Sequence, residues 1–276
     1  MTRTAIIAAL PGELKPFVRG WSHQRSNGVD LWRYPHDDGE WIAACAGAGQ
    51  AAATRAFAGI EKSGPLDRVI STGWAGALRD DLQSGQAYLV STVLDTKTGE
   101  RFAASMPNTS STLTTTAPGA QEVSGHDFSH AKTIPTKQPR ALAPEPLTLV
   151  TTPTVAAEPE KHRLALAYSA ALVDMEAAAI ARLAQMRQIP FDCIKGISDG
   201  FNDQLPDFNR FILSDGSFQL SRFVLFSFLR PWYWPALIQM GENSRKAAQS
   251  IAESLLHLLN PRGQIRERNG YPNHKH

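Results

Sequence analysis

Short apolar segments alternate with segments of helical periodicity along most of this chain, and this alternation restricts the fold more than any other feature. Strands are expected, in chain order, at 4–9, 31–34, 41–46, 68–72, 87–94, 147–152, 171–175 and 191–198. Helices are expected at 50–60, 158–168, 176–188 and 243–259. We therefore predict the α/β class, with one domain over 1–260 built on a mixed central β-sheet flanked by helices. The polar residues 261–276 are expected to form a tail.

The charge and the cysteines exclude several classes of protein. A formal net charge of +2 on 276 residues disfavours nucleic-acid binding, which depends on a large excess of cationic side chains. Cys45 and Cys193 lie far apart and form no CxxC motif, so we expect neither a disulfide framework nor a metal site. The N-terminal apolar run is short and ends at Pro11, unlike a signal peptide. The chain is therefore expected in the reducing cytoplasm.

Residues 96–145 are rich in threonine, serine, proline and glycine and carry few large apolar side chains. A stretch of this length within a domain is either a functional loop or disordered, and we predict a long loop here. His126 and His130 have the spacing of ligands on one turn of helix, but no further ligand lies near them in sequence. We expect them to be solvated loop histidines.

An apolar, aromatic stretch covers 223–240. Arg230, Pro231 and Pro235 interrupt it, whereas a membrane-spanning helix needs about 20 predominantly apolar residues in succession. We therefore expect no span and predict a core helix, a turn at Arg230 and Pro231, and a second short helix. The alternative is an aromatic surface that contacts a lipid-like substrate or a partner.

Three acidic residues stand at the predicted carboxyl ends of apolar strands. Glu13 follows the first strand after a Pro-Gly turn, Glu176 follows 171–175, and Asp199 follows 191–198. A carboxylate is costly to bury without a partner, and ligands of open α/β sheets bind outside the carboxyl ends of the strands. The three side chains are therefore candidates for one polar site. The alternative is that each caps a helix, because acidic residues favour first turns.

Four motifs carry a resemblance to a known family. IIAALPGEL (6–14), STGWAGAL (71–78), VDMEAAAIA (173–181) and KGISDG (195–200) occur in the order and spacing of the nucleoside phosphorylase/nucleosidase family, and the chain most resembles its 5′-methylthioadenosine/S-adenosylhomocysteine nucleosidases. The resemblance covers roughly 1–95 and 147–205. It implies a homodimeric enzyme that hydrolyses the N-glycosidic bond of an adenosine derivative and releases adenine, without a metal or organic cofactor.

The resemblance also implies a role for each acidic residue. The aspartate of the family's SD motif, which protonates the leaving base, matches Asp199, and Ser198 would orient it. The glutamate that binds the ribose hydroxyls matches Glu176, and Met175 would line the face of the sugar. In the hydrolytic branch a glutamate near the N-terminus helps to activate water, and Glu13 stands at that position.

The predicted glycine turn at 73–76 bears on the choice between hydrolysis and phosphorolysis. The family's phosphorylases hold phosphate with an arginine next to Gly73, but this chain has Ser71 at the arginine position, as a nucleosidase does. Trp74 replaces a serine that is common in both branches. Its indole either fills the space of the nucleophile or stacks on the substrate.

Other candidate contacts also depart from the family pattern. Val155 and Ala156 stand near the place of a phenylalanine that stacks on the purine, and they either line the base or pack in the core. Lys195 stands where nucleosidases often have arginine.

Three alternatives therefore stay open. One is a phosphorylase. Another is cleavage of a lipid-linked adenosine, because VTTPTVAAEPEKHRLA, VDMEAAA, LPDF and the apolar 223–240 resemble the phosphorylase-like proteins associated with hopanoid biosynthesis. The third is a non-catalytic nucleoside-binding domain in which Trp74 blocks the site.

GAGQAAA (47–53) resembles a dinucleotide-binding fingerprint, but its context does not fit one. The strand that precedes it is predicted to form a hairpin, and the next strand ends in Thr72 and Gly73 rather than in an acidic residue. We expect these glycines to allow close packing of a helix on the sheet, and we expect no NAD site.

Overall fold

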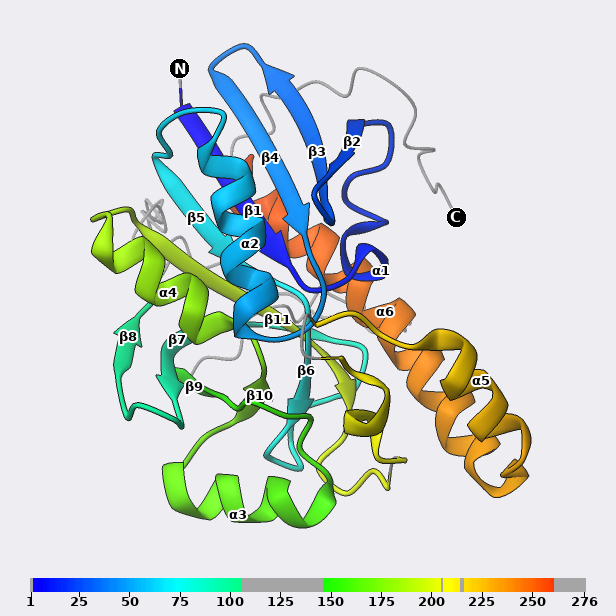
Figure 1. The fold of residues 1–276 in the computed structure, drawn as a ribbon. Helices are drawn as coiled ribbons and strands as arrows, with labels where there is room; N and C mark the ends of the chain where they lie inside the picture. Colours follow the sequence, from blue (N-terminus) through cyan, green and yellow to red (C-terminus); the bar gives the residue numbers. More distant parts are fainter. Residues whose placement is uncertain (1, 106–145, 205, 214–215, 261–276) are drawn as a thin grey trace, which may run out of the picture.

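The computed structural model describes residues 2–105, 146–204, 206–213 and 216–260, and it contains one mixed sheet with helices on both faces (Figure 1). The α/β class and the mixed central sheet are thus as predicted. The strands are β1 (Thr2–Ala8), β2 (Ser22–Ser26), β3 (Val29–His36), β4 (Gly39–Cys45), β5 (Arg68–Ser71), β6 (Trp74–Ala77), β7 (Ala87–Asp95), β8 (Arg101–Ala103), β9 (Leu147–Thr151), β10 (Leu172–Asp174) and β11 (Phe191–Asp199). The helices are α1 (Pro11–Leu14), α2 (Gln50–Glu61), α3 (Glu158–Tyr168), α4 (Ala177–Met186), α5 (Leu220–Phe228) and α6 (Trp234–Leu259), with short 3₁₀ helices η1 (Phe208–Phe211) and η2 (Pro231–Tyr233).

Strand β11 joins two halves of the sheet. The strand order is β2-β3-β4-β1-β5-β11-β6-β10-β9-β7-β8, and β11 also pairs with β7. The first residues of β11 pair with β5, and its later residues pair with β6 and β7. The pairings β11–β6–β10–β9–β7–β11 therefore close five strands into a ring, while β1, β4 and β5 form a parallel layer beside it.

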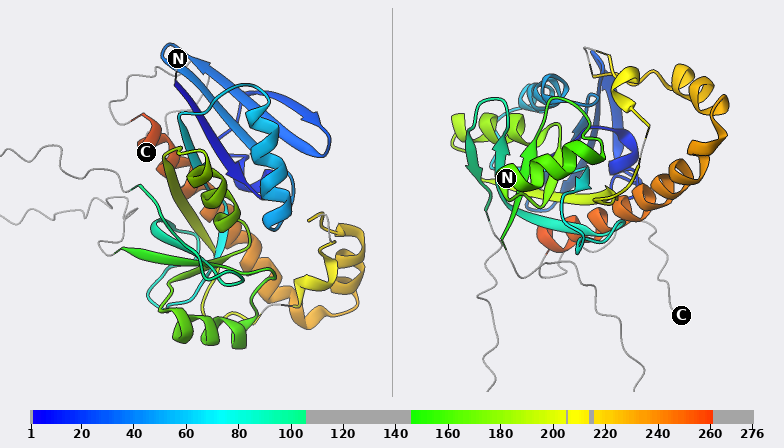
Figure 2. Two further views of the ribbon diagram at one scale, coloured as in Figure 1. Left: turned by 60° about the vertical axis from the view of Figure 1, so that its left-hand side comes forward. Right: turned by 90° about the horizontal axis from the view of Figure 1, so that it is seen from below.

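Alternate residues of β1 pack against different helices. Ala5 and Ile7 belong to a buried cluster with α2 and α4, whereas Ile6 and Ala8 belong to a second cluster with α1 and α6. Successive side chains of a strand point to opposite faces, so β1 has to be apolar on both. Figure 2 shows α2 and α4 on one side of this layer and α6 on the other.

The sequence prediction missed three strands, β2, β6 and β8. The predicted glycine turn at 73–76 is mostly strand, because β6 begins at Trp74. Within the predicted loop 96–145, residues 101–103 form β8, which pairs with β7. Residues 106–145, with His126 and His130, lie outside the described residues, as does the predicted tail 261–276.

The predicted boundary of the last helix was wrong. We expected Asn243 or Ser244 to cap it, because asparagine and serine favour that position. Instead α6 begins at Trp234, and both residues are buried within it. Pro235 lies in the first turn, where a missing N–H breaks no hydrogen bond.

The expectation of a core helix within 223–240 was also wrong, although the turn at Arg230 and Pro231 is present. Helix α5 and the start of α6 expose large apolar side chains, which are described below. No helix within the described ranges is both long enough and apolar enough to cross a membrane. Cys45 and Cys193 are free and buried.

Candidate active site

A cavity of about 160 Å³ opens at the carboxyl ends of β1, β10 and β11. Glu13, Glu176 and Asp199 all line it. Glu13 lies on α1 directly after β1, Glu176 follows β10, and Asp199 is the last residue of β11. All three are nearly buried, at 3%, 7% and 9% exposure. The structure thus brings together three carboxylates that are up to 186 positions apart in the numbering of the chain.

Glu13 is held by three backbone N–H groups. Its Oε2 accepts hydrogen bonds from the amides of Ala9 (2.7 Å) and Leu10 (2.8 Å), and its Oε1 accepts one from Trp74 (2.9 Å). Burial raises the pKa of Glu13, and these hydrogen bonds oppose the rise. A carboxylate has about four acceptor sites, so one is left for a ligand in the cavity. Gly73 allows this packing, because a Cβ there would lie 2.9 Å from the Glu13 carboxylate and its φ is +118°.

Glu176 has more free hydrogen-bonding capacity. Its Oε1 accepts a hydrogen bond from the amide of Gly49 (2.6 Å), and its Oε2 accepts a long one from Met175 (3.3 Å). Burial, followed by the charge of Asp174, raises the pKa of Glu176 to about 8. The carboxyl group therefore changes its charge in the physiological range, next to Met175, which lines the same cavity.

Gly49 belongs to the GAGQAAA motif, which we had interpreted as a packing device. Its φ of +89° places the residue in a region that favours glycine, and its N–H points to Glu176 rather than to the sheet. The β3–β4 pair that precedes the motif is an antiparallel hairpin, as predicted. The glycine turn thus supplies a hydrogen bond to the candidate site.

A buried ion pair lies beside Glu176. Asp174 accepts hydrogen bonds from Thr151 (2.7 Å) and from the amide of Ala177 (2.9 Å), and it pairs with Lys195 at 2.9 Å. Burial lowers the pKa of Lys195, but its negative neighbours, above all Asp174, together raise it by more, so the lysine stays charged. Lys195 is not among the residues that line the cavity. Its ammonium charge nevertheless opposes the rise in pKa at both Glu13 and Glu176.

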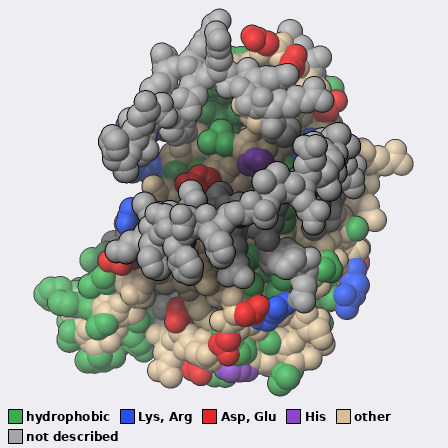
Figure 3. All heavy atoms as spheres, turned by 180° about the vertical axis from the view of Figure 1, so that it is seen from behind, with side chains coloured by type: hydrophobic (Ala, Val, Ile, Leu, Met, Phe, Trp, Pro, Cys, Tyr) green, Lys and Arg blue, Asp and Glu red, His purple; other side chains and the backbone are tan. Residues whose placement is uncertain are grey.

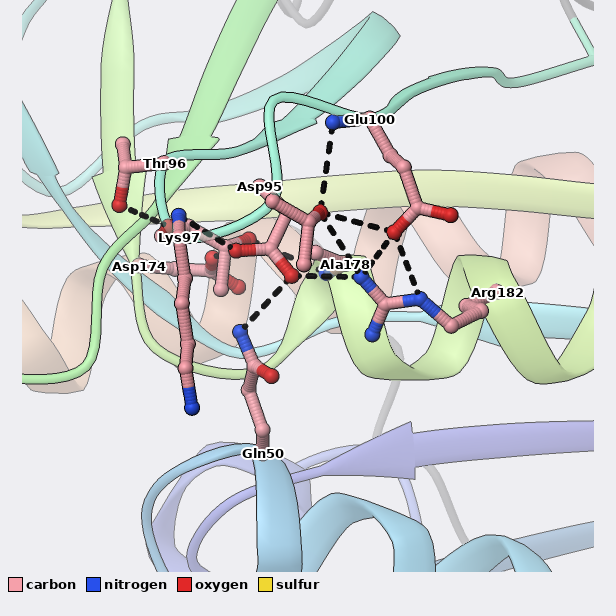
Figure 4. Close-up of polar contacts among 10 residues, drawn as sticks. Gln50, Asp95, Thr96, Lys97, Glu100, Asp174, Ala178 and Arg182 are labelled. Carbon is pink, nitrogen blue, oxygen red and sulfur yellow. Dashed lines mark hydrogen bonds and ion pairs between the residues drawn. The ribbon is translucent and has the colours of Figure 1, made fainter.

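Polar contacts anchor the helices that surround this pair (Figure 4). Asp95, at the end of β7, accepts hydrogen bonds from Arg182 on α4 (2.6 Å) and Gln50 on α2 (3.4 Å). Arg182 also donates to Glu100 at 2.6 Å. Since Gln50 follows Gly49 in the chain, these contacts fix the turn whose N–H binds Glu176.

Asp199 has two partners. Ser198 donates a hydrogen bond to its Oδ1 at 2.6 Å, and the Lys161 ammonium, on α3, contacts its Oδ2. Lys161 is 1% exposed and also donates to the carbonyl of Gly200 at 2.6 Å. Lys161 was not predicted from the sequence, because a charged residue between Glu160 and His162 is typical of a solvated helix face.

Trp74 forms part of the cavity wall. Its indole Nε1 donates a hydrogen bond to the carbonyl of Ser244 on α6 at 3.0 Å, and its ring packs on Gly12. The ring is therefore fixed between α1 and α6. The cavity stays open next to it.

Val155 and Ala156 also line the cavity. Asn209 in η1 makes two hydrogen bonds with Val155: its Oδ1 accepts from the backbone N–H at 2.8 Å, and its Nδ2 donates to the backbone carbonyl at 3.0 Å. This pair attaches η1 to the wall of the cavity. No sequence pattern indicated Asn209, which lies 54 positions from Val155.

A second cavity of about 350 Å³ adjoins the first. The two share Ala48, Thr154 and Met175, so a ligand can extend from one into the other. Among the remaining lining residues are Lys97 and the apolar Ile212 and Leu213. In the described part of the chain, no group of three or more His, Cys, Asp or Glu side chains is arranged to hold a metal ion.

Solved structures of similar fold include three enzymes of nucleoside cleavage. Futalosine hydrolase of Helicobacter pylori is 14% identical, with a TM-score of 0.63 over 94% of this chain and 98% of that chain. The 5′-methylthioadenosine/S-adenosylhomocysteine nucleosidase of Neisseria meningitidis, solved with methylthio-immucillin-A, is 17% identical, with a TM-score of 0.63 over 95% and 100%. The S-adenosylhomocysteine nucleosidase of Streptococcus pyogenes is 16% identical, with a TM-score of 0.59 over 94% and 97%.

A search of curated protein sequences gives no match. The likeness to the solved structures shows a shared fold. The family model of the phosphorylase superfamily matches residues 3–216, which is well over half of the chain and includes all three acidic residues. The resemblance of the motifs is thereby confirmed, and the chain belongs to the phosphorylase superfamily.

Proposed function

We propose that this protein is a purine nucleosidase, which hydrolyses the N-glycosidic bond of an adenosine derivative and releases adenine. The observation that carries the proposal is the meeting of Glu13, Glu176 and Asp199 around one cavity at the ends of three strands. Comparison with other proteins also supports the proposal, because the chain shares its fold with proteins described as 5′-methylthioadenosine/S-adenosylhomocysteine nucleosidases. By analogy with these proteins, the substrate is an adenosine with a thioether or apolar 5′ group.

Asp199 serves the leaving base. When the bond between C1′ and the purine breaks, the electron pair stays on the base, and a proton on a ring nitrogen neutralises the developing charge. Val155, Ala156 and Ser198 line the same cavity as Asp199, and we place the base between them. Ser198 fixes one carboxylate oxygen, so that the other oxygen carries the proton between Lys161 and the base.

Lys161 is a positioning residue that also holds the proton for Asp199. Its ammonium group donates to Oδ2 of Asp199. As negative charge builds on the purine, a proton passes from this pair, through Asp199, to the base. General acid catalysis of this kind is typically worth 10²- to 10⁴-fold in rate.

Glu176 and Met175 bind the sugar. Glu176 has unused acceptor sites that face the cavity, and its negative charge stabilises the positive charge that develops on the ribose in the transition state. Ionised Glu176 accepts hydrogen bonds from the ribose hydroxyls. Because the pKa of this residue lies near 8 in the empty site, binding improves as the pH rises toward that value.

Glu13 positions the water that attacks C1′. The carboxylate is immobilised by three amides and keeps one acceptor site, which is sufficient for one water molecule. The water adds its oxygen to C1′, and its proton passes to Glu13. The raised pKa of this buried carboxyl group favours its acting as a base near neutral pH.

Hydrolysis fits the cavity better than phosphorolysis does. Among the described residues, neither arginine nor lysine lines the cavity that holds the acidic residues. A phosphate co-substrate would need such a partner, whereas three carboxylates repel it. Ser71, at the position of the phosphorylase arginine, agrees with this choice.

A second candidate function is the cleavage of adenosine that carries a long apolar 5′ substituent, as in the hopanoid-linked alternative. The adjoining cavity, with Ile212 and Leu213 on its wall, favours this candidate. A substituent at the 5′ position extends away from the base, and Met175 lines both cavities. In either candidate function, Trp74 forms part of the cavity wall. Gly73 and Lys195 support the site without lining the cavity.

The decisive experiment measures adenine release from 5′-methylthioadenosine, with and without phosphate. The proposal requires release in the absence of phosphate and free 5-methylthioribose as the second product. Release that depends on phosphate and yields 5-methylthioribose 1-phosphate would establish the phosphorylase instead. Binding of adenine without turnover of any nucleoside would establish the non-catalytic alternative, in which Trp74 occupies the position of the nucleophile.

We also propose that the enzyme is a homodimer in the cytoplasm, as the resemblance implies. Sedimentation equilibrium of the purified chain tests the dimer, and fractionation of cells that express the tagged chain tests the compartment.

A further inference from the structure

Residues 218–240 form an arm that projects from the body of the molecule. The arm consists of α5, η2 and the first turns of α6, and it extends away from the sheet in every view (Figures 1 and 2). Helix α5 has nine residues, and all but three of them are apolar. A short helix of this composition would normally be buried on all sides.

The inner face of the arm has its own aromatic core. Phe211 packs against Phe223 and Phe226 with ring centroids 5.4 Å and 5.2 Å apart, and Phe226 stacks on Tyr233 at 6.1 Å. The Arg230 guanidinium lies 4.0 Å from the centre of the Phe226 ring. These contacts hold α5 against η1 and η2. The arm is therefore a folded unit with a defined outer face.

The outer face is apolar and exposed. Phe228, Leu229 and Trp232 at the tip are 69%, 62% and 68% exposed, and Val224 and Leu225 extend the same surface along α5. Figure 3 shows hydrophobic side chains gathered on the projecting part of the molecule, at its lower left. A soluble monomer rarely leaves so many large apolar side chains together in water, so this surface has a partner.

The charges of the arm identify the kind of partner. From residue 218 to residue 241 the sequence has two charged side chains, Arg222 and Arg230, and no carboxylate. Arg222 is exposed, while Arg230 borders the tip. An apolar tip with tryptophan at its edge and arginine beside it has the composition of a surface that inserts among the headgroups of an anionic bilayer.

We infer that the arm docks the protein on the surface of an anionic membrane. Nine residues of α5 rise about 14 Å, about half of the thickness of a bilayer's hydrocarbon core, so α5 lies in the interface rather than across it. Phe228, Leu229 and Trp232 enter the boundary between headgroups and acyl chains, and Arg222 binds lipid phosphate. Residues 208–213, at the root of the arm, contribute Ile212 and Leu213 to the second cavity, so docking brings that cavity close to the lipid.

Sedimentation of the full chain with lipid vesicles tests this inference. We expect the protein to sediment with vesicles of phosphatidylcholine mixed with phosphatidylglycerol, and more weakly with phosphatidylcholine alone or at high salt. The double variant Phe228→Ser and Leu229→Ser should lower the partition coefficient roughly tenfold or more, because two inserted side chains are lost. Arg222→Gln should reduce only the preference for anionic vesicles.

The matched control replaces two large apolar residues that are exposed on the body, Leu166 (86%) and Met186 (72%). Leu166→Ser with Met186→Ser should leave vesicle binding unchanged. Wild-type protein that stays in the supernatant with anionic vesicles would overturn the inference. So would a wild-type dimer that the Phe228→Ser and Leu229→Ser variant dissociates without any change in vesicle binding, because a second copy would then cover the surface.

The measurement does not depend on the proposed catalytic function. The arm variants alter no residue of the first cavity, so turnover of a water-soluble nucleoside should stay within about twofold of the wild type, as for surface substitutions away from a site. Loss of vesicle binding with activity retained is the expected result. Activity that is absent from all forms of the protein would contradict the proposed function and leave the membrane result intact.

Discussion

The active-site cavity and the arm depart in opposite ways from the usual distribution of side chains. Around the cavity, Glu13, Glu176 and Asp199 are buried, each with hydrogen-bonding partners that limit the cost of burial. On the arm, Phe228 and Trp232 are exposed, although aromatic residues favour the interior. Both features make the folded state less stable than a sequence selected for stability alone would be. The comparison indicates that buried charge marks the proposed ligand site, whereas exposed apolar surface marks the proposed docking site.

The largest expected effect is on catalysis. Asp199→Asn should lower kcat about 10³-fold, roughly 4 kcal/mol of barrier, because an amide cannot pass a proton to the base. The melting temperature should change little, since the amide still accepts a hydrogen bond from Ser198. Steady-state kinetics and thermal melting check this, with the exposed Asp81→Asn as the control. Full activity in the Asp199 variant would refute the assigned role.

The next largest effect is on stability, and it distinguishes the packed inner face of the arm from the exposed outer face. Phe211 is 5% exposed at the centre of the aromatic core, so Phe211→Ala should lower the free energy of unfolding by about 3 kcal/mol. Urea denaturation measures this change, provided the arm unfolds together with the body. A loss near zero would mean that the inner face contributes nothing to stability and that the arm is not a folded unit.

A pH-dependent effect sharpens the account of the cavity. The pKa of Glu176 is near 8 in the folded protein, against 4.5 for an ordinary glutamate, so the folded state binds more protons between these values. The contribution of Glu176 to stability is fully present below its pKa in the unfolded chain, 4.5, and is lost as the pH rises toward 8. Wild-type stability should therefore fall by on the order of 2 kcal/mol between about pH 5 and pH 7.

Glu176→Gln should remove the part of this slope that Glu176 contributes and leave the part that comes from the raised pKa of Glu13. Urea denaturation at a series of pH values would show the change. Glu160→Gln on the surface of α3 is the control and should keep the slope, because the pKa of Glu160 is lowered by its hydrogen bond to Arg163. Equal slopes in the wild type and the Glu176 variant would contradict burial as the cause.

A smaller effect tests the role of Lys161. Lys161→Met should lower kcat about tenfold, with KM within about twofold, because Asp199 loses the ammonium group that positions it and supplies a proton. Lys161→Arg keeps the charge but does not release its proton near neutral pH. If the arginine variant restores activity, Lys161 acts through its charge and supplies no proton.

The smallest effect concerns the outer face of the arm. Phe228→Ala should change the free energy of unfolding by less than about 0.5 kcal/mol, because its ring already lies in water. The same urea titration as for Phe211 measures it. A loss as large as that of Phe211→Ala would show that the ring is packed in solution, and the surface would then not be available for docking.

Much of the fold could be predicted from periodicity. The strand at β1, the hairpin of β3 and β4, and helix α2 follow from alternation, turn chemistry and an alanine-rich helical segment. Strand β6 was missed because Trp74–Ala77 is short and rich in small residues, and it is a strand only through its partners β10 and β11. Helix α6 was predicted to be too short, because Asn243 favours a cap and its burial depends on packing.

The sequence by itself determined the class of the fold and the identity of the three acidic residues, because strand ends and motif spacing are local properties. Only the tertiary structure decided that Lys161 pairs with Asp199, that Gly49 binds Glu176, and that Phe228, Leu229 and Trp232 are exposed. The reason is physical. A side chain's partners and its exposure depend on which distant segments fold against it, and an apolar stretch has the same pattern whether it faces a core or a membrane.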